Sequence, residues 1–213
     1  MPTSSANHDA LVARLRSGDD TVLADLFSLY RERLWRMVHF RMDRRLAGRV
    51  DPDDIIQEAY LAAAQRLEHF RANSGLTAFG WLRAVAHQTL IDVHRRHLGA
   101  EMREAGREVA IDHCYATTSA SLVLQLAGSM TSPSRAAMRA EISAQLEQAI
   151  EGMDALDREV LALRHYEELT NSEVAEALGI EANAASVRYF RALKRLKTIL
   201  SKMSAFEDEA PHG

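Results

Sequence analysis

Apolar side chains along residues 9–103 recur at the three- and four-residue spacing of helices that bury one face. The longest of these stripes runs from Leu23 to Val38, and no segment shows the alternation of a half-buried strand. This part of the chain therefore predicts four helices and no strand, after a disordered tail at residues 1–8. The expected helices cover residues 9–16, 21–48, 51–67 and 77–97, with a loop at 71–75.

Residues 104–133 have a different composition, in which Thr, Ser, Gly and Pro typical of turns and linkers interrupt the apolar pattern. Helical patterning resumes at Pro133. Further helices are expected near 134–151, 155–167, 171–178 and 182–203, followed by a tail at 204–213. A connection of about thirty residues is longer than compact domains usually contain. The expected fold is all-α, with helical domains at 9–103 and 134–203 joined by a long linker.

The last fifty residues carry the strongest local signal. Thr170 and Glu173 have the spacing of a capping box, and Gly179 can supply the left-handed residue that ends a helix. The next helix, residues 182–203, has no acidic residue but six basic ones. A helix, a glycine turn and a basic helix are the parts of a helix-turn-helix DNA reader. Its expected packing side is Tyr189, Leu193, Leu196 and Leu200, and its expected phosphate side is Arg188, Arg191, Arg195 and Lys202.

The basic helix belongs to a chain whose formal net charge is −4, so any DNA binding must come from a local patch. Cys114 is the sole cysteine, which excludes an internal disulfide and fits a reduced, cytoplasmic setting. The first residues lack the basic and apolar regions of a signal peptide. No apolar run is long enough to cross a bilayer, so we expect no membrane insertion.

Enzyme and metal chemistry find little support in the sequence. We find no phosphate-binding loop and no nucleophile with a partnered base, and expect no catalytic activity, no cofactor and no metal. Consecutive acids at a helix start, such as Asp53 and Asp54, do not converge on a cation as ligands must. His94 and His97 lack a third ligand, so together with His87 we expect them to be surface histidines near phosphate.

Three motifs precede the helix-turn-helix in a specific order: DDIIQEAY at 53–60, FGWLRAVA at 79–86 and IDVHRR at 91–96. Together the four motifs resemble the extracytoplasmic-function group of bacterial sigma factors, over residues 9–103 and 134–203. The resemblance implies a region 2 domain that binds core RNA polymerase and opens the −10 element. It also implies a region 4 domain that reads the −35 element, and promoter DNA and an anti-sigma factor as further partners.

The resemblance assigns the polymerase-docking face of region 2 to one side of the third expected helix. Acids and an amide on one helix face suit a basic partner helix. Its residues in this chain are Asp54, Gln57, Glu58 and Leu61.

For the −10 element, the resemblance implies a flipped-base pocket in the loop 71–76 with Phe70 beside it, and basic groups for the strand. We expect Trp81 and Ile91 in the core, and Asp92 to buttress an arginine. The implied −10 contacts are Phe70, Arg71, Asn73, Arg83, His87, Gln88, Arg95 and Arg96.

For the −35 element, the first turns of helix 182–203 would enter the major groove and later residues would contact the backbone. The base readers would be Asn183, Ser186 and Arg188, and the positioning residues Arg191, Lys194 and Arg195. The chain departs from many relatives at two places, which can change both promoter preferences. His87-Gln88 stands where Arg-Asn is common, and Ala182, Ala184 and Ala185 replace larger residues.

Two other interpretations stay open from the residues alone. One is a stand-alone helix-turn-helix repressor or activator, which would be dimeric and bind duplex DNA tightly without polymerase. The polar face at 54–61 has no purpose in that interpretation. The other is a small bundle whose basic helix is merely solvated, against which the cap, the glycine and the turn spacing all argue.

Overall fold

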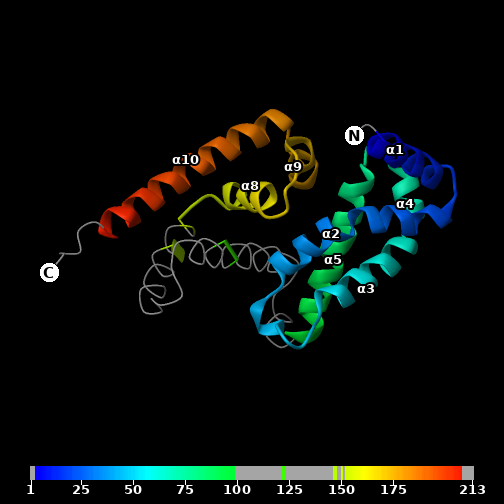
Figure 1. The fold of residues 1–213 in the computed structure, drawn as a ribbon, viewed down its shortest axis with the longest axis horizontal. Helices are drawn as coiled ribbons and strands as arrows, with labels where there is room; N and C mark the ends of the chain where they lie inside the picture. Colours follow the sequence, from blue (N-terminus) through cyan, green and yellow to red (C-terminus); the bar gives the residue numbers. More distant parts are fainter. Residues whose placement is uncertain (1–2, 99–120, 123–145, 148–149, 151, 208–213) are drawn as a thin grey trace. The chain divides into compact units, whose positions relative to one another are not determined.

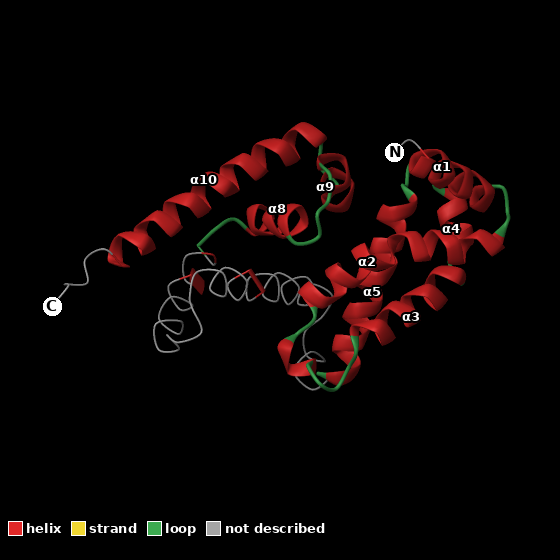
Figure 2. Ribbon diagram, in the orientation of Figure 1, coloured by secondary structure: helices red, strands yellow, loops and turns green. Residues whose placement is uncertain are grey.

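The computed structural model describes residues 3–98, 121–122, 146–147, 150 and 152–207 (Figure 1). Every regular element among these residues is helical (Figure 2). The chain divides into two compact units, Met1–Ala110 and Ile111–Gly213. The expected all-α, two-domain organisation is confirmed for the described residues. The expected linker and helix 134–151 lie largely outside them, as does Cys114.

The first unit is a bundle in which α3 packs against both α2 and α5, and α2 packs against α5. The short α4 and the N-terminal α1 contact one another at the end of this bundle. Its helices are α1 (Thr3–Arg16), α2 (Leu23–Arg41), α3 (Pro52–Ala64), α4 (Leu67–Ala72) and α5 (Ala78–His97), with short 3₁₀ turns η1 (Asp20–Val22) and η2 (Arg44–Leu46).

The core of the first unit follows the apolar stripes of the sequence. Ile56, Ala59 and Ala63 of α3 are buried, and so are all the stripe residues of α2, which are Leu23, Leu26, Phe27, Tyr30, Leu34, Met37 and Val38. Each fully buried leucine contributes about 1.5–3 kcal/mol relative to an exposed one. The predicted caps are also confirmed. Asp51 accepts a hydrogen bond from the Asp53 N–H at 2.9 Å, and Thr77 accepts one from Gly80 at 2.9 Å.

Three helix boundaries in this unit differ from those expected. Helix α1 begins at Thr3, so residues 3–8 are helical and not a disordered tail, and the His8 ring packs edge-on against Tyr30. Helix α2 ends at Arg41 and not near Gly48, because the Asp43 carboxylate accepts from the Arg45 N–H and starts η2. The third expected helix, 51–67, ends at Ala64 as α3, and the additional helix α4 covers Leu67–Ala72, so there are five α-helices among residues 3–98 and not four.

The expectation that His94 is a surface histidine is wrong. Its side chain is 4% exposed, and its Nε2 accepts a hydrogen bond from the Asp43 N–H at 3.3 Å. The break between α2 and η2 leaves this N–H without a helical partner, and the imidazole supplies one. His94 therefore joins α5 to the end of α2. His87 is half-buried and His97 is exposed.

The second unit contains α8 (Ala155–His165), α9 (Asn171–Leu178) and α10 (Ala182–Glu207) among its described residues. The capping box of Thr170 and Glu173 is formed, and Gly179 has a φ of 62° in the left-handed region at the end of α9. Both features are confirmed as predicted. Helix α10 continues to Glu207, four residues beyond the expected end at 203. In this unit, Met153, Leu161 and Ala192 form a buried apolar cluster. Tyr189, Leu193 and Leu196 pack against it, as expected.

Candidate nucleic-acid and protein interfaces

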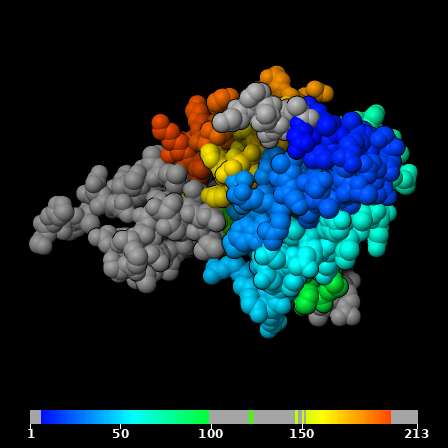
Figure 3. Space-filling model, turned by 45° about the vertical axis from the view of Figure 1, so that its right-hand side comes forward, coloured from blue at the N-terminus to red at the C-terminus, as the bar shows by residue number. Residues whose placement is uncertain are grey.

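One side of α3 is exposed, and it carries the residues expected to dock polymerase. Leu61 is 60% exposed, and Asp54 and Gln57 are exposed along the same side. Figure 3 shows the cyan surface of α3 beside the blue surface of α2. The structure therefore brings these three side chains to one surface.

A pocket of about 330 Å³ opens between α2 and α3 next to this surface. Gln57 and Leu61 form part of its wall, so the polar side of α3 and the pocket are continuous. Arg31 of α2, which lines the pocket, forms an ion pair with Asp53 of α3 at 2.6 Å. The lining is Phe27, Ser28, Arg31, Ile56, Gln57, Tyr60 and Leu61.

Glu58 has a partner within the unit. Its carboxylate accepts a hydrogen bond from Arg96 of α5 at 2.5 Å, and both side chains are about half exposed. The structure thus pairs one residue expected to bind polymerase with one expected to bind the −10 element. A mutation of Glu58 would change both surfaces, so Gln57 and Leu61 are the cleaner probes of the α3 side.

Two residues that the resemblance assigned to the flipped-base pocket are not available to a base. Phe70 is fully buried and stacks on Trp81, with ring centroids 4.7 Å apart, so it cannot stack on a nucleobase in this state. Arg71 is the penultimate residue of α4 and donates to the Leu15 carbonyl at 3.0 Å and to the carboxylates of Asp20 and Glu68. These two acids raise its pKa. The exposed part of the loop is Asn73, Ser74 and Gly75.

On α5, the residues expected to meet the −10 strand separate into buried and exposed groups. Arg83 is 9% exposed and His87 is half-buried, whereas Gln88, Arg95 and Arg96 are exposed. These three residues lie on α5, which runs through the bundle in Figure 1. The exposed set therefore lies toward the second half of α5.

The other expectations for α5 concern the burial of Trp81 and Ile91 and the role of Asp92 beside an arginine. Trp81 is in the core as expected, and Ile91 is only half-buried. Asp92 accepts from Gln88 at 3.1 Å and lies 3.7 Å from Arg95, so its predicted role beside an arginine is confirmed.

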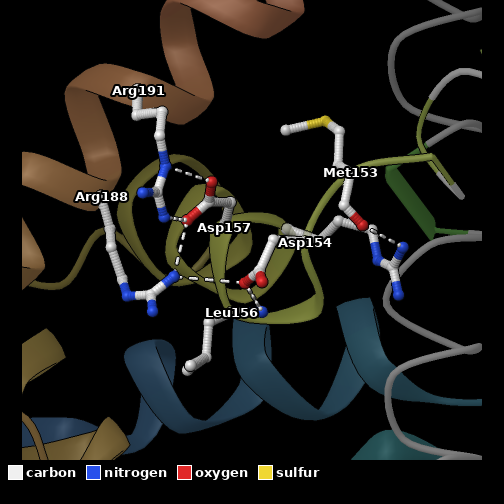
Figure 4. A network of polar contacts seen from close by, with 7 residues as sticks. Met153, Asp154, Leu156, Asp157, Arg188 and Arg191 are labelled. Carbon is white, nitrogen blue, oxygen red and sulfur yellow. Dashed lines mark hydrogen bonds and ion pairs between the residues drawn. The ribbon is translucent and has the colours of Figure 1, made fainter.

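The basic side of α10 is tied to α8. Arg191 makes two hydrogen bonds to the Asp157 carboxylate, at 2.8 and 2.7 Å, and Arg188 makes a third at 3.0 Å (Figure 4). Arg188 also reaches Asp154 at 3.2 Å, and Arg195 donates to the Gly152 carbonyl. The Asp157 side chain is only 4% exposed. Its hydrogen bonds to Arg191, and then to Arg188, lower its pKa against the opposing effect of burial.

These contacts change the interpretation of the recognition helix. Arg188 and Arg195, expected to face DNA, direct guanidinium groups toward α8 and the segment before it. Arg191 keeps 56% of its side chain exposed although it is paired. Ser186 is half-buried, whereas Asn183 and Lys194 are exposed as expected. The sequence offered no local signal for this, because the acid that pairs with the arginines is about thirty residues away.

Another side of α10 carries exposed residues that the sequence analysis missed. Val187 is 56% exposed and Phe190 is 67% exposed. They recur at helical spacing with three exposed polar residues of the same helix. We call this set the outer face of α10, and it consists of Asn183, Val187, Phe190, Lys194 and Lys197. These five residues are four, three, four and three positions apart, so the sequence alone predicts that they share one helix face.

The described residues hold no group of three or more His, Cys, Asp or Glu side chains that could bind a metal ion. Within the same part of the chain, no helix combines the length and the apolar character that a membrane span requires.

Comparison with known proteins agrees with this arrangement. The family model for sigma-70 region 2 matches residues 26–98, and that for sigma-70 region 4 matches residues 143–196. The sigma factor SigW of Bacillus subtilis (strain 168) is 25% identical over 187 residues, covering 87% of this chain and 92% of the relative. SigD of Mycobacterium tuberculosis (strain H37Rv) is 28% identical over 189 residues, covering 89% and 82%. Both are described as ECF RNA polymerase sigma factors.

A solved structure has the same fold. The match is to CnrH in its complex with the cytosolic domain of CnrY, with a TM-score of 0.50 and 20% identity. It covers 91% of this chain and 96% of that one.

A helical region 2 unit followed by a helix-turn-helix region 4 unit defines a sigma subunit of RNA polymerase. The chain belongs to the sigma-70 family, within its extracytoplasmic-function group. It is a sigma factor that directs RNA polymerase to promoters.

Proposed function

We propose that the exposed side of α3, with Asp54, Gln57 and Leu61, docks core RNA polymerase. The observation that carries this proposal is the 60% exposure of Leu61 beside the pocket between α2 and α3. Leu61 continues into a pocket lined by Phe27, Ile56 and Tyr60, and an exposed apolar surface of this kind with a polar rim is typical of a protein interface. Glu58 contributes to the same side through its pair with Arg96.

The first unit then opens the −10 element and holds one of its strands. The loop Asn73–Gly75 and the exposed residues Gln88, Arg95 and Arg96 supply polar and cationic groups suited to single-stranded DNA. Phe70, Arg71, Arg83 and His87 support these groups from within the protein rather than contacting the strand. This revised set follows from burial and pairing of the four side chains.

The second unit reads the −35 element through the outer face of α10. Asn183 offers an amide for a base edge, while Val187 and Phe190 offer apolar surface suited to thymine methyl groups. Lys194 and Lys197 follow on the same face and suit phosphate contact. The partly exposed Arg191 can reach phosphate as well, because 56% of its side chain is exposed despite its pair with Asp157.

The protein acts inside the cell as a non-catalytic subunit, and a regulatory protein of the anti-sigma type binds it. Support for such a partner comes from the solved complex of CnrH with the cytosolic domain of CnrY. That similarity is in fold, so the partner of this chain and its contact residues require a direct search.

The experiment that tests the proposed function is promoter selection by a reconstituted holoenzyme. Core polymerase plus the purified protein is incubated with a library of duplexes that contain a random segment, and the transcribed members are sequenced. We expect two conserved elements separated by a fixed spacer. As the control, the purified protein alone is used to select duplexes from the same library by binding rather than by transcription. Tight selection of one duplex motif without polymerase would contradict the proposal and favour a stand-alone regulator.

A further inference from the structure

A guanidinium group from α1 holds the loop that follows α4. Arg16 is the last residue of α1, and its Nη2 donates to the Leu76 carbonyl at 2.7 Å. Its Nη1 donates to the Phe70 carbonyl at 3.2 Å. Longer contacts of 3.4 Å join the same group to the carbonyls of Asn73 and Ser74. The Arg16 side chain thus donates to four backbone carbonyls of a segment that lies 54 to 60 positions later in the chain.

The same guanidinium also covers an aromatic stack. Its central carbon lies 4.2 Å from the centroid of the Phe70 ring, and Phe70 in turn stacks on Trp81. Cation, ring and ring therefore form a column at the base of the loop, anchored in the core through Trp81. The column explains why Phe70 is buried rather than available to a base.

The consequence is a loop with a defined outer surface. The loop carbonyls accept from Arg16, while the side chains of Asn73 and Ser74 are exposed to solvent. Asn73 is fixed further, because its Nδ2 donates to the His69 carbonyl at 2.7 Å. A segment without regular structure would otherwise sample many conformations, and a base pocket requires one.

We propose that Arg16 is a positioning residue for base capture, which orders loop 73–76 so that it can accept one unstacked base of the −10 element. This inference rests on the proposed function of the first unit. The role needs a planar group with several donors, since a lysine ammonium in the same place cannot span carbonyls at both ends of the loop. Arg16 itself does not touch the DNA.

Arg14 provides a matched control on the same helix. Its guanidinium donates to the Asp19 carboxylate, at 2.6 Å from Nη2 and 3.0 Å from Nε, and the Arg14 side chain is 55% exposed. Arg14→Lys therefore makes the same chemical change two residues away. Comparison of Arg16→Lys with Arg14→Lys separates the effect on the loop from the effect of losing any guanidinium on α1.

The test is an abasic scan across the −10 element of a forked promoter whose −10 segment is single-stranded. Holoenzyme affinity is measured for DNA that lacks one base at a time. For the natural protein and Arg14→Lys, we expect one abasic position to weaken binding roughly tenfold. For Arg16→Lys we expect that penalty to fall to about threefold or less, while the penalties at duplex −35 positions stay unchanged.

The outcomes separate the inference from the proposed function beneath it. An unchanged abasic penalty in Arg16→Lys would overturn the role of Arg16 and leave base capture intact. Equal weakening on every template, or a large drop in melting temperature, would reduce Arg16 to a general structural role and overturn the inference. If the natural protein shows no abasic penalty anywhere, base capture itself fails. Arg16→Gln serves as a second variant if Arg16→Lys does not fold.

Discussion

Asp157 is the residue that fixes the basic side of α10. Its buried carboxylate receives three hydrogen bonds from Arg188 and Arg191, so it determines which side of the helix packs and which stays outside. A buried acid without partners would be costly, whereas this one is neutralised by two arginines that still reach solvent. The ion-pair cluster therefore does more for the orientation of α10 than for net stability.

Removal of the Asp157 carboxylate should destabilise the second unit moderately. We expect Asp157→Ala to lower the free energy of unfolding by about 1–2 kcal/mol, less than for a fully buried pair, because both arginines can be hydrated. Urea unfolding of Asp157→Ala, Arg191→Ala and the double variant measures the coupling. Strictly additive effects would contradict a direct interaction between the two residues.

The same carboxylate should make stability depend on pH. Because Arg191 and Arg188 lower its pKa in the folded state, its stabilising effect is complete above the ordinary value of about 4 and is lost as pH falls through the lowered folded value. The difference in unfolding free energy between the natural protein and Asp157→Asn should therefore shrink in acid. A difference that stays constant from neutral pH down to about pH 3 would contradict this.

At the scale of elements, α10 has three distinct sides. One side packs on the core through Tyr189 and Leu193, one is clamped by Asp157, and the outer face is left exposed. The left-handed Gly179 and the hydrogen bond from Asn171 to the Ala182 carbonyl, at 2.8 Å, fix the start of the helix relative to α9. The outer face is thus held in a set orientation before any DNA is bound.

Truncation of Phe190 tests the outer face. Phe190→Ala should weaken holoenzyme binding to a selected −35 element roughly tenfold, equivalent to about 1.4 kcal/mol, with little change in melting temperature because the ring is 67% exposed. Leu29→Ala is the control, since Leu29 is an exposed apolar residue of the first unit, at 47%. Binding that is lost equally with both variants would argue against a specific −35 contact.

Several features that depend on local signals were predicted correctly from the sequence, although the end of α2 at Asp43 and the outer face of α10 were missed. The stripe of α2, the cap at Asp51 and the turn at Gly179 depend on residues a few positions apart, and each was predictable. The orientation of Arg188, the burial of His94 and the engagement of Arg71 depend on partners dozens of positions away. Periodicity says which residues share a helix face, but not which face a distant acid or carbonyl will occupy.

At the scale of the whole molecule, the two units divide the work of a sigma factor. The first carries the exposed side of α3 and the loop ordered by Arg16, and the second carries the outer face of α10. The formal net charge of −4 limits attraction of the free chain to DNA, because 30 acidic residues outnumber 26 basic ones and several of the basic groups are paired. Recruitment by polymerase then supplies the effective concentration that the chain lacks by itself.

Binding to core RNA polymerase is the measurement that tests this account most directly. Labelled protein is titrated with core enzyme, using the natural chain, Leu61→Asp with Gln57→Ala, and Leu29→Asp as a matched exposed control. We expect tight binding by the natural chain and the control, and at least roughly tenfold weaker binding by the α3 variant at unchanged melting temperature. Equal affinity of all three would place the docking surface elsewhere, and no binding by the natural chain would contradict the account as a whole.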